Sequence, residues 1–268
     1  MVSGKNKVVL ISGVSSGFGL ETAKLFIDNG YKVIGLSRKD FTYPNLDHYK
    51  CDITNEVMIK EVMTNILNKY KHIDILINNA GIGNFGPIEE TSSETIKNVF
   101  NTNFFGAFLL TKEILPSMRE NKGGRIINVS SIGAIIPLPF QAFYSASKAS
   151  LDTLFCALAS EVYKYNIKIT SIKPGDAKTN FTKNRTKDLI DKNSSYYEAY
   201  IRSLKGVEKD ETSGIPSIKI AKTIYKVSKK KHPPLSKNVG LKDSILSKIY
   251  KILPKKIGTY LLYKIYAS

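Results

Sequence analysis

Short apolar runs alternate with longer segments of helical spacing through most of this chain, and that alternation restricts the fold more than any single motif. The runs have the length of strands, and the segments between them place apolar residues three and four positions apart. Alternating strands and helices predict a parallel sheet with right-handed crossovers. We therefore expect an α/β fold built on a doubly wound parallel sheet. The expected strands are 7–11, 31–36, a short run before 50, 73–77, 125–130 and 167–172, and the expected helices include 55–70, 92–120 and 142–165.

The first junction between strand and helix is rich in glycine. It reads Ser12-Gly13-Val14-Ser15-Ser16-Gly17-Phe18-Gly19. Glycines there would let the backbone turn tightly and approach a pyrophosphate, which would face free N–H groups and the positive end of the helix dipole. A structural turn is the simpler alternative. The same residues also match Gly-x-Ser-x-Gly, the nucleophile elbow of serine hydrolases, but that elbow follows a mid-sheet strand and needs a later acid and histidine. The available histidines are His48, His72 and His232.

Polar or glycine-containing turns follow four of the expected strands. Gly13, Asn79, Ser131 and Pro174 each fall where a strand ends. The carboxyl ends of parallel strands lie at one edge of the sheet, and ligands of such folds bind beyond that edge. The coincidence predicts a single site that all four turns contribute to.

Tyr144 and Lys148 lie four residues apart in a segment with helical spacing, so both side chains should lie on one helix face. A phenol has a pKa of about 10, and a nearby ammonium is expected to lower it. Such a tyrosine can exchange a proton with an alcohol oxygen. The same spacing occurs at Tyr225 with Lys229 and at Tyr260 with Lys264. What distinguishes Tyr144 is Ser131, which ends a buried strand just upstream.

Asn103 is a polar residue within a long, largely apolar helix. Two interpretations stay open from the sequence. Its amide could be hydrogen-bonded at a helix kink, or it could hold a water in a proton relay.

The charge of the chain is concentrated near its carboxyl terminus. Residues 216–268 hold 13 lysines, no arginine and one acid, Asp243, and so carry +12 of the total of +17. A solvated lysine face is the simpler interpretation, and attraction to an anionic membrane surface is the alternative. Nucleic acid is not an expected partner, because the segment lacks arginine for bidentate base contacts and has no recognisable nucleic-acid motif.

We expect two parts in the chain. Residues 1–240 form a cofactor-binding and catalytic domain, with a polar lid at about 180–215, and residues 241–268 form a basic amphipathic helical extension divided at Pro254. The first residues lead directly into a strand, so no signal peptide is expected, and no apolar run reaches the length of a spanning helix. The predicted location is cytoplasmic, with a peripheral position at the membrane as the alternative. Two cysteines, Cys51 and Cys156, fit neither a disulfide framework nor a zinc site, and no metal is expected.

Residues 5–180 resemble the short-chain dehydrogenase/reductase family. The matching residues are Ser12-Gly13-x-x-x-Gly17-x-Gly19, Asp52, Asn78-Asn79-Ala80-Gly81, Asn103, Ser131, Tyr144-x-x-x-Lys148, Pro174-Gly175 and Thr179. Ser12 is a small departure, since the family commonly has threonine there. Residues 173–176 and the extended tail are most similar to the hydroxysteroid and retinol dehydrogenase-like members. The resemblance implies a single Rossmann-type domain.

The resemblance also implies a role for each matching residue. Tyr144 would exchange the proton, Lys148 would lower the pKa of Tyr144 and hold the nicotinamide ribose, Ser131 would bind the carbonyl oxygen, and Asn103 would hold a water. The cofactor would supply the hydride. The implied cofactor-binding residues are Gly13, Ser15, Ser16, Gly17, Phe18, Gly19, Ser37, Arg38, Asp52, Ile53, Asn79, Ala80, Gly81, Tyr144, Lys148, Pro174, Gly175 and Thr179.

The end of the second strand predicts which dinucleotide binds. NAD-specific sites commonly place a carboxylate there for the ribose 2′-hydroxyl. This chain has Ser37-Arg38-Lys39, with no acid until Asp40. A guanidinium would bind a 2′-phosphate that a carboxylate would repel. We expect NADP(H) rather than NAD(H), although Arg38 could instead stack on adenine without discriminating.

The sequence therefore predicts an NADP(H)-dependent oxidoreductase that interconverts a carbonyl and a secondary alcohol. Subgroup likeness and the aromatic residues Phe85, Phe140, Phe143 and Phe181 favour a lipophilic substrate, steroid-like or long-chain. One alternative is a nucleotide-sensing binding protein that keeps the fold without turnover. Another alternative is a membrane-recruited scaffold, which only the basic tail supports. By resemblance, a homodimer or homotetramer is expected to form through helices 92–120 and 142–165.

Overall fold

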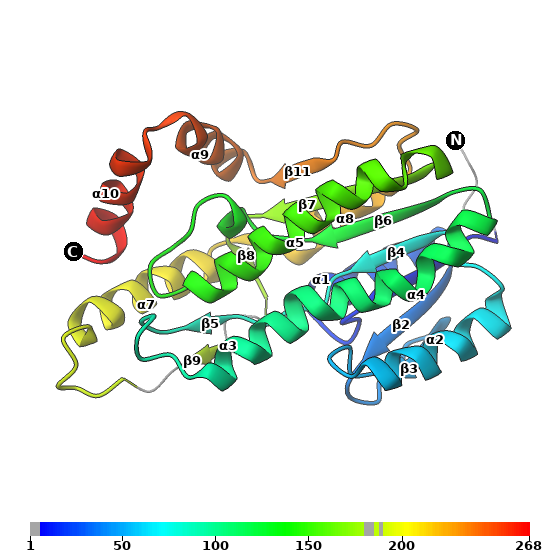
Figure 1. Cartoon of the computed structure of the whole chain (residues 1–268), viewed down its shortest axis with the longest axis horizontal. Helices are drawn as coiled ribbons and strands as arrows, with labels where there is room; N and C mark the ends of the chain where they lie inside the picture. The colour runs from blue at the N-terminus through cyan, green and yellow to red at the C-terminus, as the bar shows by residue number, and fades with distance from the viewer. Residues whose placement is uncertain (1–5, 180–184, 188–189) are drawn as a thin grey trace.

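A seven-stranded parallel sheet forms the centre of the protein in a computed structural model that describes residues 6–179, 185–187 and 190–268. The strand order is β11-β7-β6-β4-β1-β2-β3 (Figure 1). The chain starts mid-sheet at β1, moves outward to β3, and then crosses back to β4 on the other side of β1. This is the doubly wound arrangement that the alternation predicts, and its switch point lies between β1 and β4. The strands are Val8–Ser12 (β1), Lys32–Ser37 (β2), Leu46–Lys50 (β3), Ile75–Asn78 (β4), Gly124–Val129 (β6), Ile167–Pro174 (β7) and Ser236–Val239 (β11).

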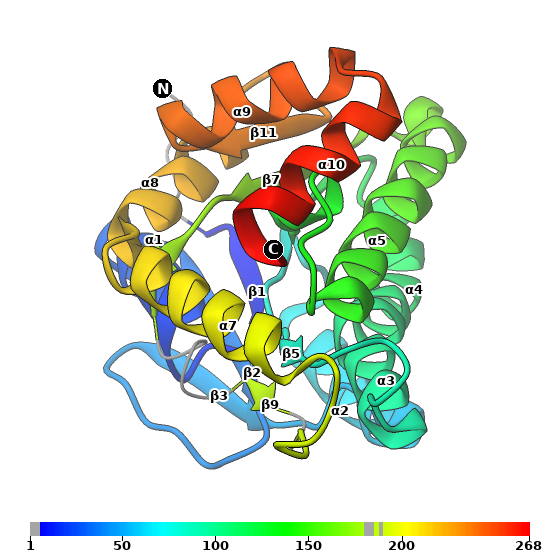
Figure 2. The same ribbon diagram turned by 90° about the vertical axis from the view of Figure 1, so that its left-hand side faces the viewer.

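Helices cover both faces of the sheet (Figure 2). On one face α2 (Glu56–Tyr70), α4 (Gly106–Glu120) and α5 (Ala142–Glu161) share an apolar cluster with the strands. On the other face α1 (Gly17–Asp28) packs against α8 (Ser217–Ser228), with Phe26 and Ile224 fully buried. The central strands are buried on both sides, which explains why they appear as continuous apolar runs in the sequence.

Local sequence signals set the ends of several helices. The Asn55 side chain accepts a hydrogen bond from the Met58 N–H and caps α2, and Ser92 does the same for α3 (Ser93–Phe100) through Thr95 N–H. Gly30 takes a φ of +78° just after α1, which is the geometry a glycine permits at low cost. Between α3 and α4 the long predicted helix continues through a π-helical turn, η1 (Asn101–Phe105).

The carboxyl-terminal third holds more regular structure than the sequence predicts. The expected polar lid contains α7 (Tyr197–Thr212), and β11 extends the sheet beyond β7. The last residues form α9 (Leu241–Ile252) and α10 (Lys255–Tyr266), which meet at Pro254 as expected. Two small pairs of strands complete the chain: β5 (Asn84–Phe85) with β9 (Thr186–Lys187), and β8 (Ala177–Lys178) with β10 (Ile215–Pro216).

Candidate active site

A cleft of about 560 Å³ lies at the carboxyl ends of β1, β2 and β4. Thirteen of the residues that the sequence assigns to a cofactor line it. They are Gly13, Ser15, Ser16, Gly17, Phe18, Ser37, Arg38, Asp52, Ile53, Asn79, Ala80, Gly81 and Thr179. The remaining lining residues are Leu36, Lys39, Cys51, Ile82, Gly83 and Thr102. The turns at Gly13 and Asn79 thus line one cleft, whereas the turns at Ser131 and Pro174 lie outside its lining.

The glycines of the first turn are required by its geometry. Gly13 and Gly17 have φ values of +69° and +55°. Gly19 lies behind the cleft wall, where an added Cβ would overlap the Gly13 carbonyl oxygen. The first turn of α1 contains no acidic residue, and its N-cap, Ser16, makes no side-chain hydrogen bond to it. The amino end of α1 can therefore accept an anion, so the residues present fit the pyrophosphate of a dinucleotide.

Asn79 and Ser12 tie β4 to the glycine turn. The Asn79 Nδ2 donates to the carbonyl oxygens of Ser12 and Gly13 at 2.9 and 3.1 Å. The backbone N–H groups of Asn79 and Ala80 both donate to Ser12 Oγ, at 3.0 and 3.1 Å. The hydroxyl of Ser12 therefore performs a structural task that the threonine common in the family could also perform.

The end of the cleft at β2 is basic. Arg38 and Lys39 line it, and Asp52 is the only acid among the described lining residues. The Ser37 hydroxyl donates to the Lys39 carbonyl oxygen at 2.7 Å and lies 2.7 Å from Nε2 of His48 on β3. Burial lowers the pKa of His48. Sequence reasoning missed this histidine, because pairing of β2 with β3 is what brings it to Ser37.

Tyr144 lies in the first turn of α5, beside Ser131. The two hydroxyls share a hydrogen bond, and a Cβ added to Gly133 would lie 3.3 Å from Ser131 Oγ and 3.6 Å from the Tyr144 ring. The Tyr144 N–H donates to Asn84 Oδ1 at 3.2 Å, which fixes the start of the helix from β5. Ser131 and Tyr144 can therefore contact the same substrate oxygen.

The pKa of the Tyr144 phenol is raised, which is opposite to the sequence-based expectation. Burial is the main cause, and the hydrogen bond from Ser131 opposes it. The Lys148 ammonium donates to the Val129 carbonyl oxygen at 2.9 Å and lies 6.0 Å from the centre of the Tyr144 ring. Burial lowers the pKa of Lys148 itself to about 8.

Asn103 connects the π-helical turn to both the cleft and α5. Its Oδ1 accepts from the Ile82 N–H at 2.8 Å, and its Nδ2 donates to the Ile82 carbonyl and to Ser147 Oγ at 2.9 and 3.0 Å. A Cβ added to Gly81 would lie 3.1 Å from Asn103 Oδ1 and 3.2 Å from Lys148 Nζ. The hydrogen-bonded interpretation thus describes this side chain, and its role in holding a water remains a prediction. Gly81, which lines the cleft, is the link between Lys148 and the cofactor space.

The structure separates the predicted site residues into two groups. Asn103, Ser131, Tyr144, Lys148, Pro174 and Gly175 lie outside the cleft lining, on the side toward β6 and β7. Gly175 is covered by α9, since an added Cβ there would overlap the Asp243 carboxylate. The group around Tyr144 is therefore a wall between the cofactor space and the carboxyl-terminal helices.

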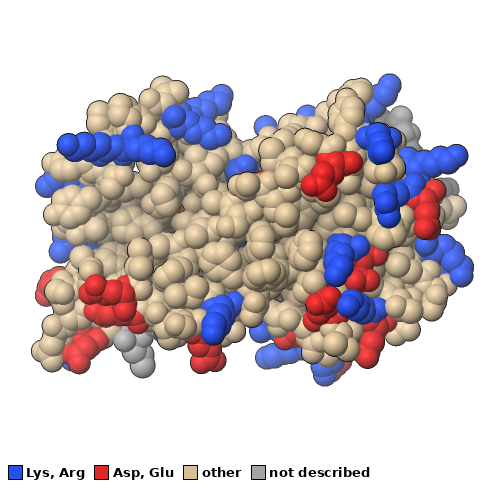
Figure 3. Space-filling view, in the orientation of Figure 1, with Lys and Arg blue, Asp and Glu red and all other residues tan. Residues whose placement is uncertain are grey.

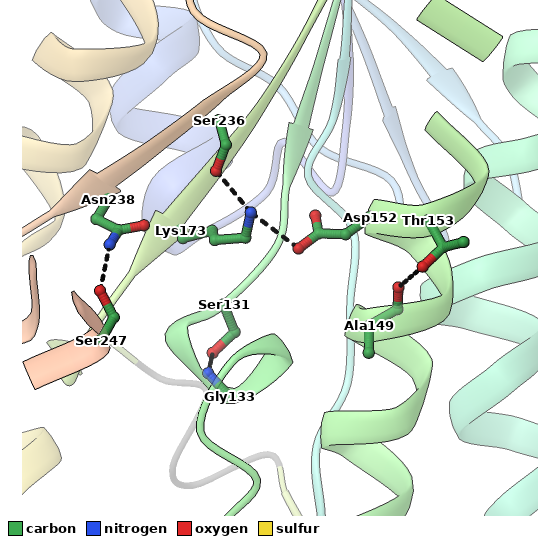
Figure 4. A network of polar contacts seen from close by, with 9 residues as sticks. All are labelled: Ser131, Gly133, Ala149, Asp152, Thr153, Lys173, Ser236, Asn238 and Ser247. Carbon is green, nitrogen blue, oxygen red and sulfur yellow. Dashed lines mark hydrogen bonds and ion pairs between the residues drawn. The ribbon is translucent and has the colours of Figure 1, made fainter. Parts of the chain in front are cut away.

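Buried and charged groups that the sequence did not single out surround this wall. Lys173 joins β7 to α5 and β11, through Asp152 at 3.0 Å and Ser236 at 2.6 Å (Figure 4). Asp176 has its pKa raised to about 6, because it is buried and close to Asp210, Asp243 and Glu211. None of these carboxylates could be placed from sequence, since three separate segments bring them together.

Aromatic residues pack next to the acidic group. Phe85, Phe140 and Tyr200 form mutual ring contacts with centroids 5.3–5.9 Å apart, and Tyr266 of α10 packs on the same cluster. Two of the aromatic residues expected near the substrate, Phe85 and Phe140, therefore lie together. Phe143 is half-buried in the first turn of α5, and Phe181 lies outside the described residues.

The chain is similar to known proteins in both sequence and structure. The family model described as short chain dehydrogenase matches residues 7–190. A 3-ketodihydrosphingosine reductase of Bacteroides thetaiotaomicron is 38% identical over 97% of this chain and 98% of that protein. A probable short-chain type dehydrogenase/reductase of Helicobacter pylori is 32% identical over 92% of this chain and 93% of its own length. Among solved structures, a short-chain dehydrogenase from Streptomyces avermitilis superposes with a TM-score of 0.84, at 28% identity, over 97% of this chain and 96% of that one.

Proposed function

The chain belongs to the short-chain dehydrogenase family and is an alcohol/carbonyl oxidoreductase, and from this premise we propose that it uses NADPH to reduce the ketone of a long-chain lipid. The substrate class is that of the relative from Bacteroides thetaiotaomicron, a 3-keto long-chain amino alcohol. The observation that carries the proposal is the likeness to that reductase across 97% of the chain, together with the Ser131–Tyr144 pair beside the cleft. Incubation with 3-ketodihydrosphingosine and NADPH tests it, by loss of NADPH absorbance and by mass of the alcohol product.

Each of the residues around the cleft would have a separate role in such a reduction. A nicotinamide cofactor, when bound, supplies the hydride. The Ser131 hydroxyl would donate to the ketone oxygen and stabilise the negative charge that develops on it. The Tyr144 hydroxyl would then give its proton to that oxygen. A raised phenol pKa keeps this proton in place at neutral pH, which suits the reducing direction. Lys148, next to Gly81, would hold the ribose through its ammonium.

A sensor that binds the nucleotide without turnover is the weaker alternative. The relatives are named as reductases and dehydrogenases, and Ser131, Tyr144 and Lys148 are all present. A binding protein has no need for a hydrogen-bonded serine and tyrosine beside the cofactor space. We therefore favour turnover.

Arg38→Asp is expected to shift cofactor preference from NADPH toward NADH. The substitution removes the guanidinium that would form charged hydrogen bonds with the 2′-phosphate. The kcat/KM for NADPH should therefore fall by roughly 10–100-fold. The basic lining at Arg38 and Lys39 supports this. Steady-state kinetics with each cofactor measure the shift. Arg119→Asp, the same charge change at the end of α4, is the control and should leave the preference as it is. A wild-type enzyme that prefers NADH would contradict the assignment.

Asp176, near Tyr144, favours a substrate with a positive amine. Its carboxylate is close enough to influence the pKa of the Tyr144 phenol, whereas the nearby Glu211 carboxylate is paired with Arg185. We therefore propose that Asp176 contributes to recognition of the substrate ammonium. Asp176→Asn is expected to lower kcat/KM for 3-ketodihydrosphingosine severalfold more than for a long-chain ketone that lacks the amine.

The pH dependence of this preference follows from the Asp176 pKa of about 6. Above that pH the carboxylate is charged and attracts the ammonium, and below it the carboxyl group is neutral. The ratio of kcat/KM values for the amino ketone and the plain ketone should therefore fall as pH drops through about 6, and Asp176→Asn should flatten that profile. An unchanged profile in the variant would rule out this role for Asp176.

A further inference from the structure

The two carboxyl-terminal helices present their apolar residues outward. Seventeen large apolar side chains are exposed in the described part of the chain, and ten of them lie between Leu241 and Ile265. On α9 they repeat at helical spacing, so they form one continuous stripe. We call this set the C-terminal apolar face: Leu241, Ile245, Leu246, Ile249, Ile252, Ile257, Tyr260, Leu261, Tyr263 and Ile265.

The side of α9 that contacts the domain contains small polar residues. Ser247 is 1% exposed and accepts a hydrogen bond from Asn238 Nδ2 of β11 at 2.7 Å (Figure 4). Ser244 donates to the Gly240 carbonyl oxygen, and Gly258 of α10 lies against the Tyr250 ring. A helix that docks on a domain ordinarily buries its apolar stripe. In α9 the serines face the domain, and the isoleucines face outward.

Basic side chains of α9 and α10 lie on the outer surface, and the single acid of these helices points inward. Six exposed lysines flank the C-terminal apolar face: Lys242, Lys248, Lys251, Lys255, Lys256 and Lys264. The one acid of residues 241–268, Asp243, is turned inward over Gly175. Over α9 and α10 the visible surface in Figure 3 shows blue and tan atoms and no red ones. An outer surface that combines apolar and cationic side chains complements lipid tails below anionic headgroups.

We propose that α9 and α10 dock on an anionic membrane, with the C-terminal apolar face in the headgroup region and the lysines on lipid phosphates. None of the described helices is long and apolar enough to cross a membrane, so these helices would lie in the interface plane. Tyr260 and Tyr263 suit that depth, since tyrosine favours the boundary between lipid and water. A second copy of the chain fits this surface less well, because an isologous contact would bring the lysines of both copies together.

The helices that carry the C-terminal apolar face adjoin the group of residues around Tyr144 in the candidate active site. Tyr266 of α10 packs on the cluster that contains Phe85 and Tyr200, and α10 contacts α7 (Figure 2). Asp243 of α9 lies over Gly175, next to the end of β7. Docking would therefore place this side of the site at the bilayer, where a lipophilic substrate resides. Binding to the membrane does not depend on the proposed substrate and is measured without turnover.

Vesicle flotation with the full-length protein tests the proposal. The probe is phosphatidylcholine vesicles with and without phosphatidylglycerol. Wild-type protein should float with the anionic vesicles and far less with the neutral ones. The triple substitution Ile245→Glu, Ile249→Glu, Ile252→Glu should reduce flotation at least about tenfold. Its control is Val57→Glu, Ile88→Glu, Tyr163→Glu, which changes three other exposed large apolar residues outside α9 and α10 and should float as the wild type does.

A second pair of variants separates docking by these helices from general charge attraction. Lys248→Gln, Lys251→Gln, Lys255→Gln should weaken flotation at least about tenfold, whereas Lys229→Gln, Lys230→Gln, Lys231→Gln remove the same charge from an exposed run outside α9 and α10 and should have a small effect. Equal effects of the two triples would overturn the proposal. So would failure of the wild type to float, or a concentration-dependent dimer that Ile249→Glu abolishes. An unchanged circular dichroism spectrum and melting temperature would show that each variant is folded.

Discussion

Tyr144→Phe should lower kcat for ketone reduction by about 10²–10⁴-fold, which is the usual contribution of a positioned proton donor. Phenylalanine keeps the aromatic ring beside Ser131 but removes the hydroxyl that would protonate the substrate oxygen. The cofactor cleft is lined by other residues, so NADPH affinity should stay close to that of the wild type. Steady-state turnover and titration of NADPH fluorescence measure the two effects separately.

Tyr225→Phe is the matched control for this substitution. Tyr225 also precedes a lysine by four residues, and Lys229 Nζ lies 5.1 Å from its ring centre. Tyr225 lies on α8, which packs on the opposite face of the sheet, and Lys229 is the C-cap of that helix. Its turnover should be unchanged. If Tyr144→Phe retained the wild-type kcat, the assigned proton donor would be wrong, whatever the fold.

Glu211→Ala is expected to destabilise the protein by about 3–5 kcal/mol, the largest stability effect we predict. Glu211 of α7 forms an ion pair with Arg185, whose side chain is fully buried against the Phe85 ring. Removal of the carboxylate deprives the buried guanidinium of this ion pair. Urea unfolding followed by circular dichroism measures the loss.

Glu208→Ala provides the control one turn earlier on the same helix. Glu208 pairs with Lys187 at 2.6 Å between the same two segments, but 42% of the lysine and 35% of the glutamate side chain are exposed. Water screens such a pair, so the expected cost is below about 1 kcal/mol. Similar losses in both variants would show that burial of Arg185 does not determine the energy of the pair.

The framework of the fold could be predicted because one physical rule sets it. Strands buried on both faces appear as continuous apolar runs, and their carboxyl ends meet at one edge of the sheet. Gly13 and Asn79, which line the same cleft, could therefore be assigned to one region from the sequence. The glycine turn was also predictable, because positive φ values at Gly13 and Gly17 need residues without a Cβ.

Contacts between distant segments could not be predicted in this way. The strand β11 is short, partly exposed and polar at Ser236 and Asn238, so it lacks an apolar signal. Helix α7 is polar on most of its surface and is held by Tyr200, Val207 and the Arg185–Glu211 pair, none of which is evident from local spacing. The pKa of Tyr144 was expected to fall, but the backbone carbonyl of Val129 binds the Lys148 ammonium and burial dominates.

Several expectations stay predictions. They are the boundary at residue 240 between two parts of the chain, assembly through helices 92–120 and 142–165, the cytoplasmic location and the individual roles of the site residues. The part of the expected lid at 180–184 and 188–189 lies outside the described residues.

The central claim is that this chain reduces a lipid ketone with a nicotinamide cofactor at Tyr144. The most direct measurement is product formation from 3-ketodihydrosphingosine and NADPH by the wild-type protein, with Tyr144→Phe beside it. We predict the alcohol product, formed in step with NADPH loss and nearly absent in the variant. Tight binding of NADPH with no reduction of this ketone or of a panel of other ketones would contradict the account and favour a nucleotide sensor.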